Sequence, residues 1–238
     1  MKSKKGHCHL CGKFKDLTFE HIPPKSANND QPILIKKFEH LFDKKSFVYG
    51  KSIRSNKGSG LYCFCKSCNN NTGTWYSRDF SDFVCQANKY FNNAKIVNRV
   101  NFIEFNFKPL NVLKQVITMF LAIDHSNFLR NDKELVNFIL EKDNNSLPDK
   151  YQIYLYNTIS KNKRLYGIQW NNLNGVMNTH SEITFNPFGY FLTVDSSPPI
   201  KTMTNITEYK KFQFNESNNH IIPLFFLKTD KMHLGQYD

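Results

Sequence analysis

Residues 65–75, which read CKSCNNNTGTW, decide the fold of the first half of the chain. They contain a C-x2-C pair, Cys65 and Cys68, and an earlier pair with the same spacing is Cys8 and Cys11. Two such pairs supply four thiolates, the ligand set of a structural zinc site with tetrahedral geometry. We therefore expect all four cysteines to bind one Zn²⁺, and buried free cysteine is the alternative.

Other cysteines and histidines lie close to these pairs. Cys63 could pair with Cys65 instead, but the C-x2-C spacing favours the assignment above, so we expect Cys63 and Cys85 to be core thiols. His7 and His9 flank the first pair and could be ligands. We favour exposed positions for both, where they would contact phosphate.

Composition and charge limit the classes of protein that fit. The chain has 238 residues and a net charge of +12, and its first 100 residues hold 18 Lys and Arg against 7 Asp and Glu. A basic half favours a polyanionic partner, with nucleic acid first and a membrane surface second. The sequence has no apolar run of about 18 residues and no secretory signal, so we expect a cytoplasmic protein without membrane spans. Cysteines in that reducing compartment favour metal binding over disulfides.

The chain divides into two predicted regions, residues 1–95 and 96–238. In the first region, Phe80, Phe83 and Ala87 recur at helical spacing after Trp75. In the second, residues 110–123 predict a strongly apolar helix central to a core. A further helix is expected over 132–141 with Asp132 as its N-cap. Strands are expected at residues 102–107, 151–157, 165–170, 182–185, 190–194, 209–214 and 221–227. This order predicts an α+β fold with an antiparallel sheet.

The segment between the cysteine pairs carries a second candidate site. It is 53 residues long, too long for an ordinary zinc finger, and it contains Glu20 directly before His21. A carboxylate can hold a hard divalent cation while the neighbouring imidazole acts as a general base near neutral pH. Asn69, just after the second pair, could add an amide oxygen ligand or simply cap a helix.

These motifs in this order resemble the zinc-containing HNH endonucleases with a ββα-metal core. The resemblance covers roughly residues 7–85 and rests on Cys8-x2-Cys11, Glu20-His21-Ile22-Pro23, Cys65-x2-Cys68-Asn69 and Gly73. The rest of the chain is similar to bacterial proteins in which such a module precedes an α+β region of unassigned role.

The resemblance implies roles for individual residues. It makes His21 the general base, and it makes Glu20 and Asn69 the ligands of a catalytic Mg²⁺ or Mn²⁺, while the zinc is structural. The implied reaction is phosphodiester hydrolysis that leaves 5′-phosphate and 3′-hydroxyl ends. The family's middle asparagine has no clean match, and Asn56 is the nearest candidate.

Basic residues around these motifs form the expected nucleic-acid surface. Contacts to backbone phosphates are assigned to Lys13, Lys25, Arg54, Lys57 and Lys66. The lysine pairs at 36–37 and 44–45 are either a solvated face or a guide for DNA.

The favoured hypothesis is a DNA endonuclease in a defence, restriction or mobile-element setting. A homodimer would let one site per chain cut both strands. Two alternatives stay open. The first is a zinc-stabilised module that binds nucleic acid without cutting it. The second is a regulatory protein that binds a partner protein or ligand through residues 96–238, whose charge is near neutral.

Overall fold

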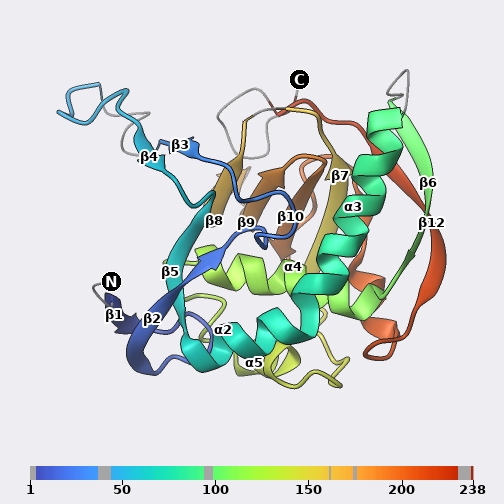
Figure 1. The fold of residues 1–238 in the computed structure, drawn as a ribbon, viewed down its shortest axis with the longest axis horizontal. Coiled ribbons are helices and arrows are strands. Elements are labelled where there is room, and N and C mark those ends of the chain that lie inside the picture. Colours follow the sequence, from blue (N-terminus) through green and yellow to red (C-terminus); the bar gives the residue numbers. More distant parts are fainter. Residues whose placement is uncertain are drawn as a thin grey trace.

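Antiparallel sheets and buried helices organise the chain, which confirms the expected α+β class (Figure 1). The computed structural model describes residues 4–36, 44–93, 99–160, 162–173, 176–229 and 237. Lys37 and the expected boundary between residues 95 and 96 lie outside these ranges. Among the helices of the described ranges, none is both long and apolar enough to cross a membrane.

The N-terminal region is a three-stranded sheet followed by a long helical segment. The sheet has the order β1-β2-β5, with β1 at Lys4–His7, β2 at Phe14–His21 and β5 at Gly60–Cys65. Helix α2 at Lys66–Thr72 follows directly, and a π-helical turn at Gly73–Ser77 joins it to α3 at Arg78–Asn93. The helical segment begins at Lys66, well before Trp75. Helical spacing of apolar residues appears in the sequence only after Trp75, because the residues of α2 are mostly polar and show no apolar period.

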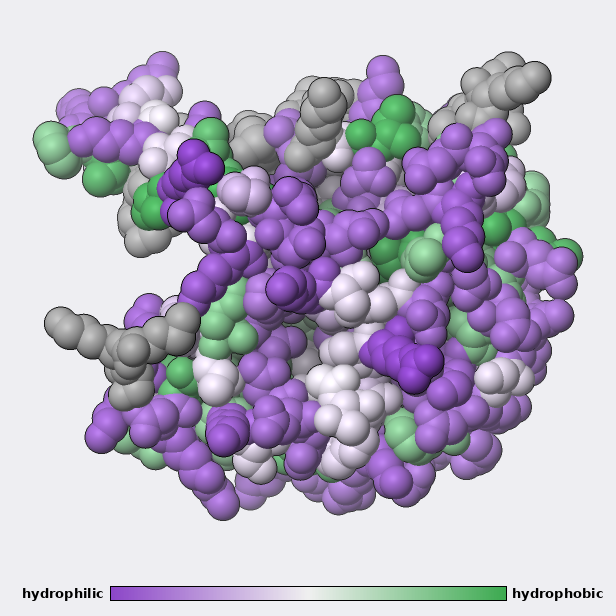
Figure 2. Space-filling view, in the orientation of Figure 1, coloured by the Kyte–Doolittle hydropathy of each residue, from purple (hydrophilic) through white to green (hydrophobic). Residues whose placement is uncertain are grey.

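A small hairpin projects from this region (Figure 1, Figure 2). Its strands, β3 at Ile33–Ile35 and β4 at Ile53–Ser55, pair only with each other among the described strands. Both strands belong to the segment between the two cysteine pairs.

The C-terminal region holds a five-stranded antiparallel sheet of order β11-β7-β10-β9-β8 and a two-stranded sheet of β12 and β6. The strands are β6 (Val100–Phe107), β7 (Tyr151–Asn157), β8 (Arg164–Leu173), β9 (Val176–Phe185), β10 (Phe188–Val194), β11 (Thr204–Asn205) and β12 (Asn218–Phe225).

One strand prediction was wrong. Residues 209–214 form no strand, and Thr207–Lys211 is a 3-10 helix instead. Tyr209 lies on this 3-10 helix and Phe212 follows its last residue, and both side chains pack against the core.

Helix α4 at Pro109–Ile123 lies across the large sheet, and all its residues are buried, as predicted (Figure 1). Its polar side chains find partners. The Nζ of Lys114 donates hydrogen bonds to the carbonyls of Glu141 (2.7 Å) and Lys142 (3.0 Å), at the end of helix α5. Helix α5 spans Lys133–Leu140 and is capped by Asp132, which confirms that prediction. The largest hydrophobic cluster includes residues of both regions, so they share one core.

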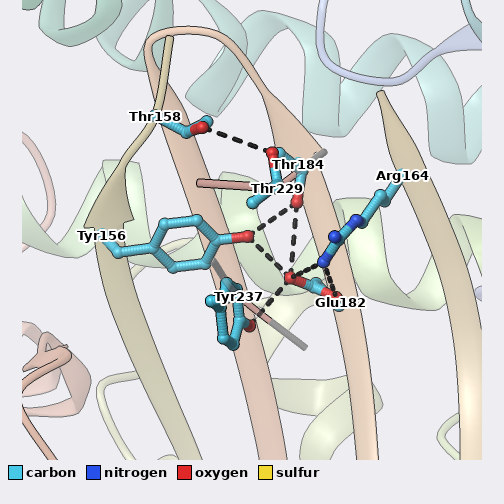
Figure 3. A network of polar contacts seen from close by, with 7 residues as sticks. All are labelled: Tyr156, Thr158, Arg164, Glu182, Thr184, Thr229 and Tyr237. Atoms are coloured by element: carbon cyan, nitrogen blue, oxygen red, sulfur yellow. Dashed lines mark hydrogen bonds and ion pairs between the residues drawn. The ribbon is translucent and has the colours of Figure 1, made fainter. Parts of the chain in front are cut away.

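A buried polar network crosses β7, β8 and β9 (Figure 3). The carboxylate of Glu182 pairs with the fully buried Arg164 at 3.4 Å. It also accepts hydrogen bonds from Tyr156 (2.6 Å) and from Tyr237 (2.8 Å) near the C-terminus. Because buried charges are costly unless they are paired, these contacts fix the order and register of the strands that carry them.

Candidate metal centre and active-site cavity

The four cysteines of the two C-x2-C pairs come together in a cluster that could hold a metal ion. Their sulfur atoms all lie within 4.8 Å of one another, and the Sγ atoms of Cys11 and Cys65 are 3.9 Å apart. Thiolates bound to one tetrahedral Zn²⁺ at about 2.3 Å would be about 3.8 Å apart. The backbone N–H of Cys65 also donates a hydrogen bond to the Cys8 sulfur (3.3 Å). The cluster therefore fits such an ion.

The thiols of the cluster influence one another's protonation. The pKa of Cys8 is lowered to about 4, chiefly because the Cys68 thiol hydrogen-bonds to its sulfur. The same bond raises the pKa of Cys68, because it favours the protonated form there. Burial raises the pKa of Cys11. In the ion-free protein the sulfurs thus share protons, which a bound cation would displace.

The burial of the other cysteines and of His9 agrees only in part with the predictions from sequence. Cys63 is buried, as predicted, and burial raises its pKa. The prediction for Cys85 was wrong, because it lies on the exposed face of α3, about 100° around the helix from buried Val84. The prediction for His9 was also wrong. Its Nδ1 lies 2.9 Å from the carbonyl oxygen of Ala122, so the ring joins the first cysteine pair to α4.

Glu20, His21 and Asn69 line one open cavity of about 510 Å³. Glu20 and His21 end strand β2, while Asn69 lies on α2. The pairing of β2 with β5 shifts register at Thr18 and Phe19, just before the Glu-His pair. Such a bulge bends the strand and re-aims the side chains that follow it. Glu20 and Asn69 are 49 positions apart in the sequence, yet both lie in one wall of the cavity with His21.

The carboxylate of Glu20 is buried in this wall. The residue is 8% exposed, and within the described ranges no hydrogen bond or ion pair satisfies its carboxylate. Burial raises the pKa of Glu20 to about 8. A buried carboxylate without a protein partner is costly when ionised, and a bound cation would remove that cost.

The imidazole of His21 is half-buried at the cavity wall. Burial lowers its pKa, while a hydrogen bond with the Lys57 backbone acts in the opposite direction. The positive charges of Lys25 and Lys57 lower the pKa further. The ring therefore favours its neutral form at pH 7, the form that can accept a proton.

Asn69 is held by its amide group. Its Nδ2 donates hydrogen bonds to the Thr18 hydroxyl (2.9 Å) and to the Phe19 carbonyl (3.5 Å), the two residues of the bulge. The amide oxygen has no protein partner among the described residues, so it remains available as an oxygen ligand.

Asn29 is a positioning residue that sequence analysis did not identify. It is buried, and its Nδ2 donates to the carbonyls of Pro23 (2.6 Å) and Ser59 (2.7 Å), while its Oδ1 accepts from the Ser59 N–H (2.7 Å). These bonds tie the turn after His21 to the start of β5. Asn56, the nearest match by sequence, instead accepts a hydrogen bond from an arginine at the surface.

Two glycines beside these hydrogen bonds let neighbouring backbone segments approach closely. Gly58 has a φ of +76°, and a Cβ there would lie 2.3 Å from the backbone oxygen of Asn29. A Cβ at Gly60 would lie 2.2 Å from the backbone oxygen of Glu20. Only glycine therefore permits the close packing that holds the cavity wall.

The residues predicted to bind nucleic acid are placed at different distances from the cavity. Lys25 lines it, and Lys57 places its Nζ 5.5 Å from the ring centroid of Phe19, another lining residue. Lys66 begins α2, and Arg54 lies on β4. Lys13 precedes β2 and lies at the opposite end of that strand from His21, about 26 Å away at the usual rise per residue. The structure thus brings Lys25 and Lys57 to the cavity and leaves Lys13 apart.

Comparisons of the chain with protein-family models, with curated proteins and with solved structures give no match.

Proposed function

We propose that this protein is a metal-dependent endonuclease of the HNH type that hydrolyses phosphodiester bonds in DNA. One observation carries the proposal. The buried carboxylate of Glu20, without a protein partner, lines the same open cavity as the His21 imidazole and Asn69. A cation ligand, a neutral imidazole and room for a substrate are the parts that metal-assisted hydrolysis needs.

The order of elements around the cavity supports this assignment. Two antiparallel strands, β2 and β5, are followed at once by α2, and the cavity lies where the end of β2 meets that helix. This is the arrangement that a ββα-metal module would have (Figure 1).

We assign the four-cysteine cluster to structural Zn²⁺. Four thiolates complete a tetrahedral shell and leave no position for a substrate. The cluster joins the turn before β2 to the start of α2, so a bound ion would hold together the two elements that carry Glu20 and Asn69.

The proposed reaction gives each of these side chains a role. His21 accepts the proton of the attacking water, and its hydrogen bond with the Lys57 backbone orients the ring. Glu20 and Asn69 would hold a Mg²⁺ or Mn²⁺ ion, which would supply positive charge for the phosphate and the leaving 3′ oxygen. Lys25 at the rim binds a neighbouring phosphate.

DNA is the proposed substrate because the excess charge belongs to the region of the chain that carries this cavity. The first 100 residues hold nearly all of the net charge of +12. Contacts from lysine and arginine to phosphates do not read sequence, so we expect binding that weakens strongly with salt and has little base preference.

The test is cleavage of supercoiled plasmid by purified protein with Mg²⁺, with Mn²⁺, and with neither ion. We expect metal-dependent nicking that His21→Ala lowers at least about a hundredfold, the usual contribution of a general base. His125→Ala, at an exposed position away from the cavity, is the matched control. Equal activity of wild type and His21→Ala, or DNA binding without any cleavage, would refute the proposal and favour a binding module.

A further inference from the structure

The hairpin that projects from the N-terminal region has an unusual surface. We call it the β3–β4 arm and define it as the described residues 31–36 and 44–57. In Figure 2 hydrophobic and hydrophilic atoms lie side by side on this projection, at the upper left of the molecule. A free hairpin of this kind is marginally stable in water without a partner surface.

The arm lies in a basic stretch of the chain, whose residues 37–43, outside the described ranges, contain Glu39 and Asp43. Its basic residues are Lys36, Lys44, Lys45, Lys51, Arg54 and Lys57. No acidic residue occurs within the described part of the arm. The excess of positive charge in this stretch of the chain is complementary to a polyanion.

The apolar side chains of the arm face solvent. Phe47 is 87% exposed and Leu34 is 72% exposed, while Tyr49 and Ile53 are also exposed. The Nζ of Lys51 lies 3.3 Å from the centroid of the Phe47 ring, so a cation accompanies the aromatic group. Exposed apolar groups gathered on one small projection indicate a binding surface.

The base of the arm is fixed to the cavity. Residues 31–36 follow Asp30, which lines the cavity, and residues 44–57 lead into Gly58. Asn29 joins these two ends through its hydrogen bonds with Ser59. The Ser55 hydroxyl also donates to the Gly58 carbonyl (2.7 Å). A polymer bound in the cavity would therefore pass the arm.

We propose that the β3–β4 arm is a second DNA-contacting element of this protein. Its lysines and arginine bind backbone phosphates, and Phe47 inserts between two base pairs of the duplex. The inference rests on the proposed function, because it takes DNA as the substrate of the cavity. A two-stranded ribbon fits a DNA groove, and apolar side chains presented there are the groups that unstack base steps.

The test is duplex binding measured by fluorescence anisotropy without added Mg²⁺ or Mn²⁺. The salt concentration is varied between about 50 and 200 mM, a range over which affinity that depends on phosphate contacts falls steeply. Phe47→Ala should weaken binding by about tenfold with an unchanged salt dependence, since it removes stacking and no charge. Phe102→Ala, an exposed phenylalanine on β6, is the matched control.

A double variant separates the phosphate contacts. Lys44→Gln with Lys51→Gln should lower the slope of log K against log salt by about 0.9 for each lost contact. Lys201→Gln with Lys228→Gln, at exposed positions outside the arm, should leave the slope unchanged. A duplex with 2-aminopurine should brighten on binding wild type and stay dark with Phe47→Ala, because unstacking relieves its quenching.

Unchanged affinity and slope in the arm variants would overturn the proposal, as would a Phe47→Ala effect confined to single-stranded DNA. Because the binding assay involves no cleavage, it is independent of His21. If the arm variants bind DNA as wild type does while plasmid cleavage still depends on His21, the DNA-contacting role of the arm is refuted and the nuclease proposal stands. Weakened binding by the arm variants without any plasmid cleavage would refute the nuclease and leave the arm as a DNA-binding element.

Discussion

Replacement of Glu20 by glutamine should stabilise the protein at alkaline pH when no Mg²⁺ or Mn²⁺ is present. The folded state raises the pKa of this carboxyl from 4.5 to about 8 because of burial. The folded protein thus retains a proton that the unfolded chain releases, and the free energy of unfolding of wild type falls as pH rises between these values. At one pKa unit per about 1.4 kcal/mol, the full loss is at most about 5 kcal/mol.

Glu20→Gln lacks this titration and keeps a similar shape. We expect its stability advantage over wild type to be near zero at pH 4.5, to grow with pH, and to level off above pH 8. Urea denaturation at a series of pH values measures it, with zinc retained and no other divalent ion added. The zinc ligands are common to both proteins, so their titration cancels in the difference. Glu104→Gln, at an exposed position on β6, controls for the loss of one carboxylate.

Addition of Mg²⁺ at pH 8 should then reduce the stability advantage of Glu20→Gln over wild type. Wild type gains stability from any ion that binds its folded state, while Glu20→Gln gains much less. A difference between the two proteins that does not change with pH would refute the burial argument. Equal stabilisation of both by Mg²⁺ would refute the role of Glu20 as a ligand.

Three further substitutions test other parts of the structure. Cys68→Ser should abolish the binding of one zinc ion per chain, measured by elemental analysis, and should lower the melting temperature. Asn29→Ala should cost about 1–3 kcal/mol in urea denaturation, because it leaves buried backbone groups of Ser59 and Pro23 unsatisfied, and should slow plasmid cleavage at unchanged zinc content. Arg164→Met should cost about 3–5 kcal/mol, because it leaves the Glu182 charge buried without its partner; a loss below 1 kcal/mol would contradict this.

The sequence by itself determined the features that depend on local spacing. The two C-x2-C pairs identified the four cysteines that the fold brings together. The apolar run at residues 110–123 predicted helix α4, and Asp132 predicted the start of α5. Each of these follows from periodicity or from hydrogen bonds within a few residues, which neighbours in the chain specify.

Only the tertiary structure decided the features that depend on distant contacts. The sequence placed Glu20 beside His21, but burial by the surrounding elements sets its raised pKa. Asn29 gains its role from bonds to Ser59, 30 residues away, and the Arg164–Glu182 pair joins two strands. No local pattern marks such partners, because hydrogen bonds and ion pairs between distant segments exist only once packing has excluded water from around them.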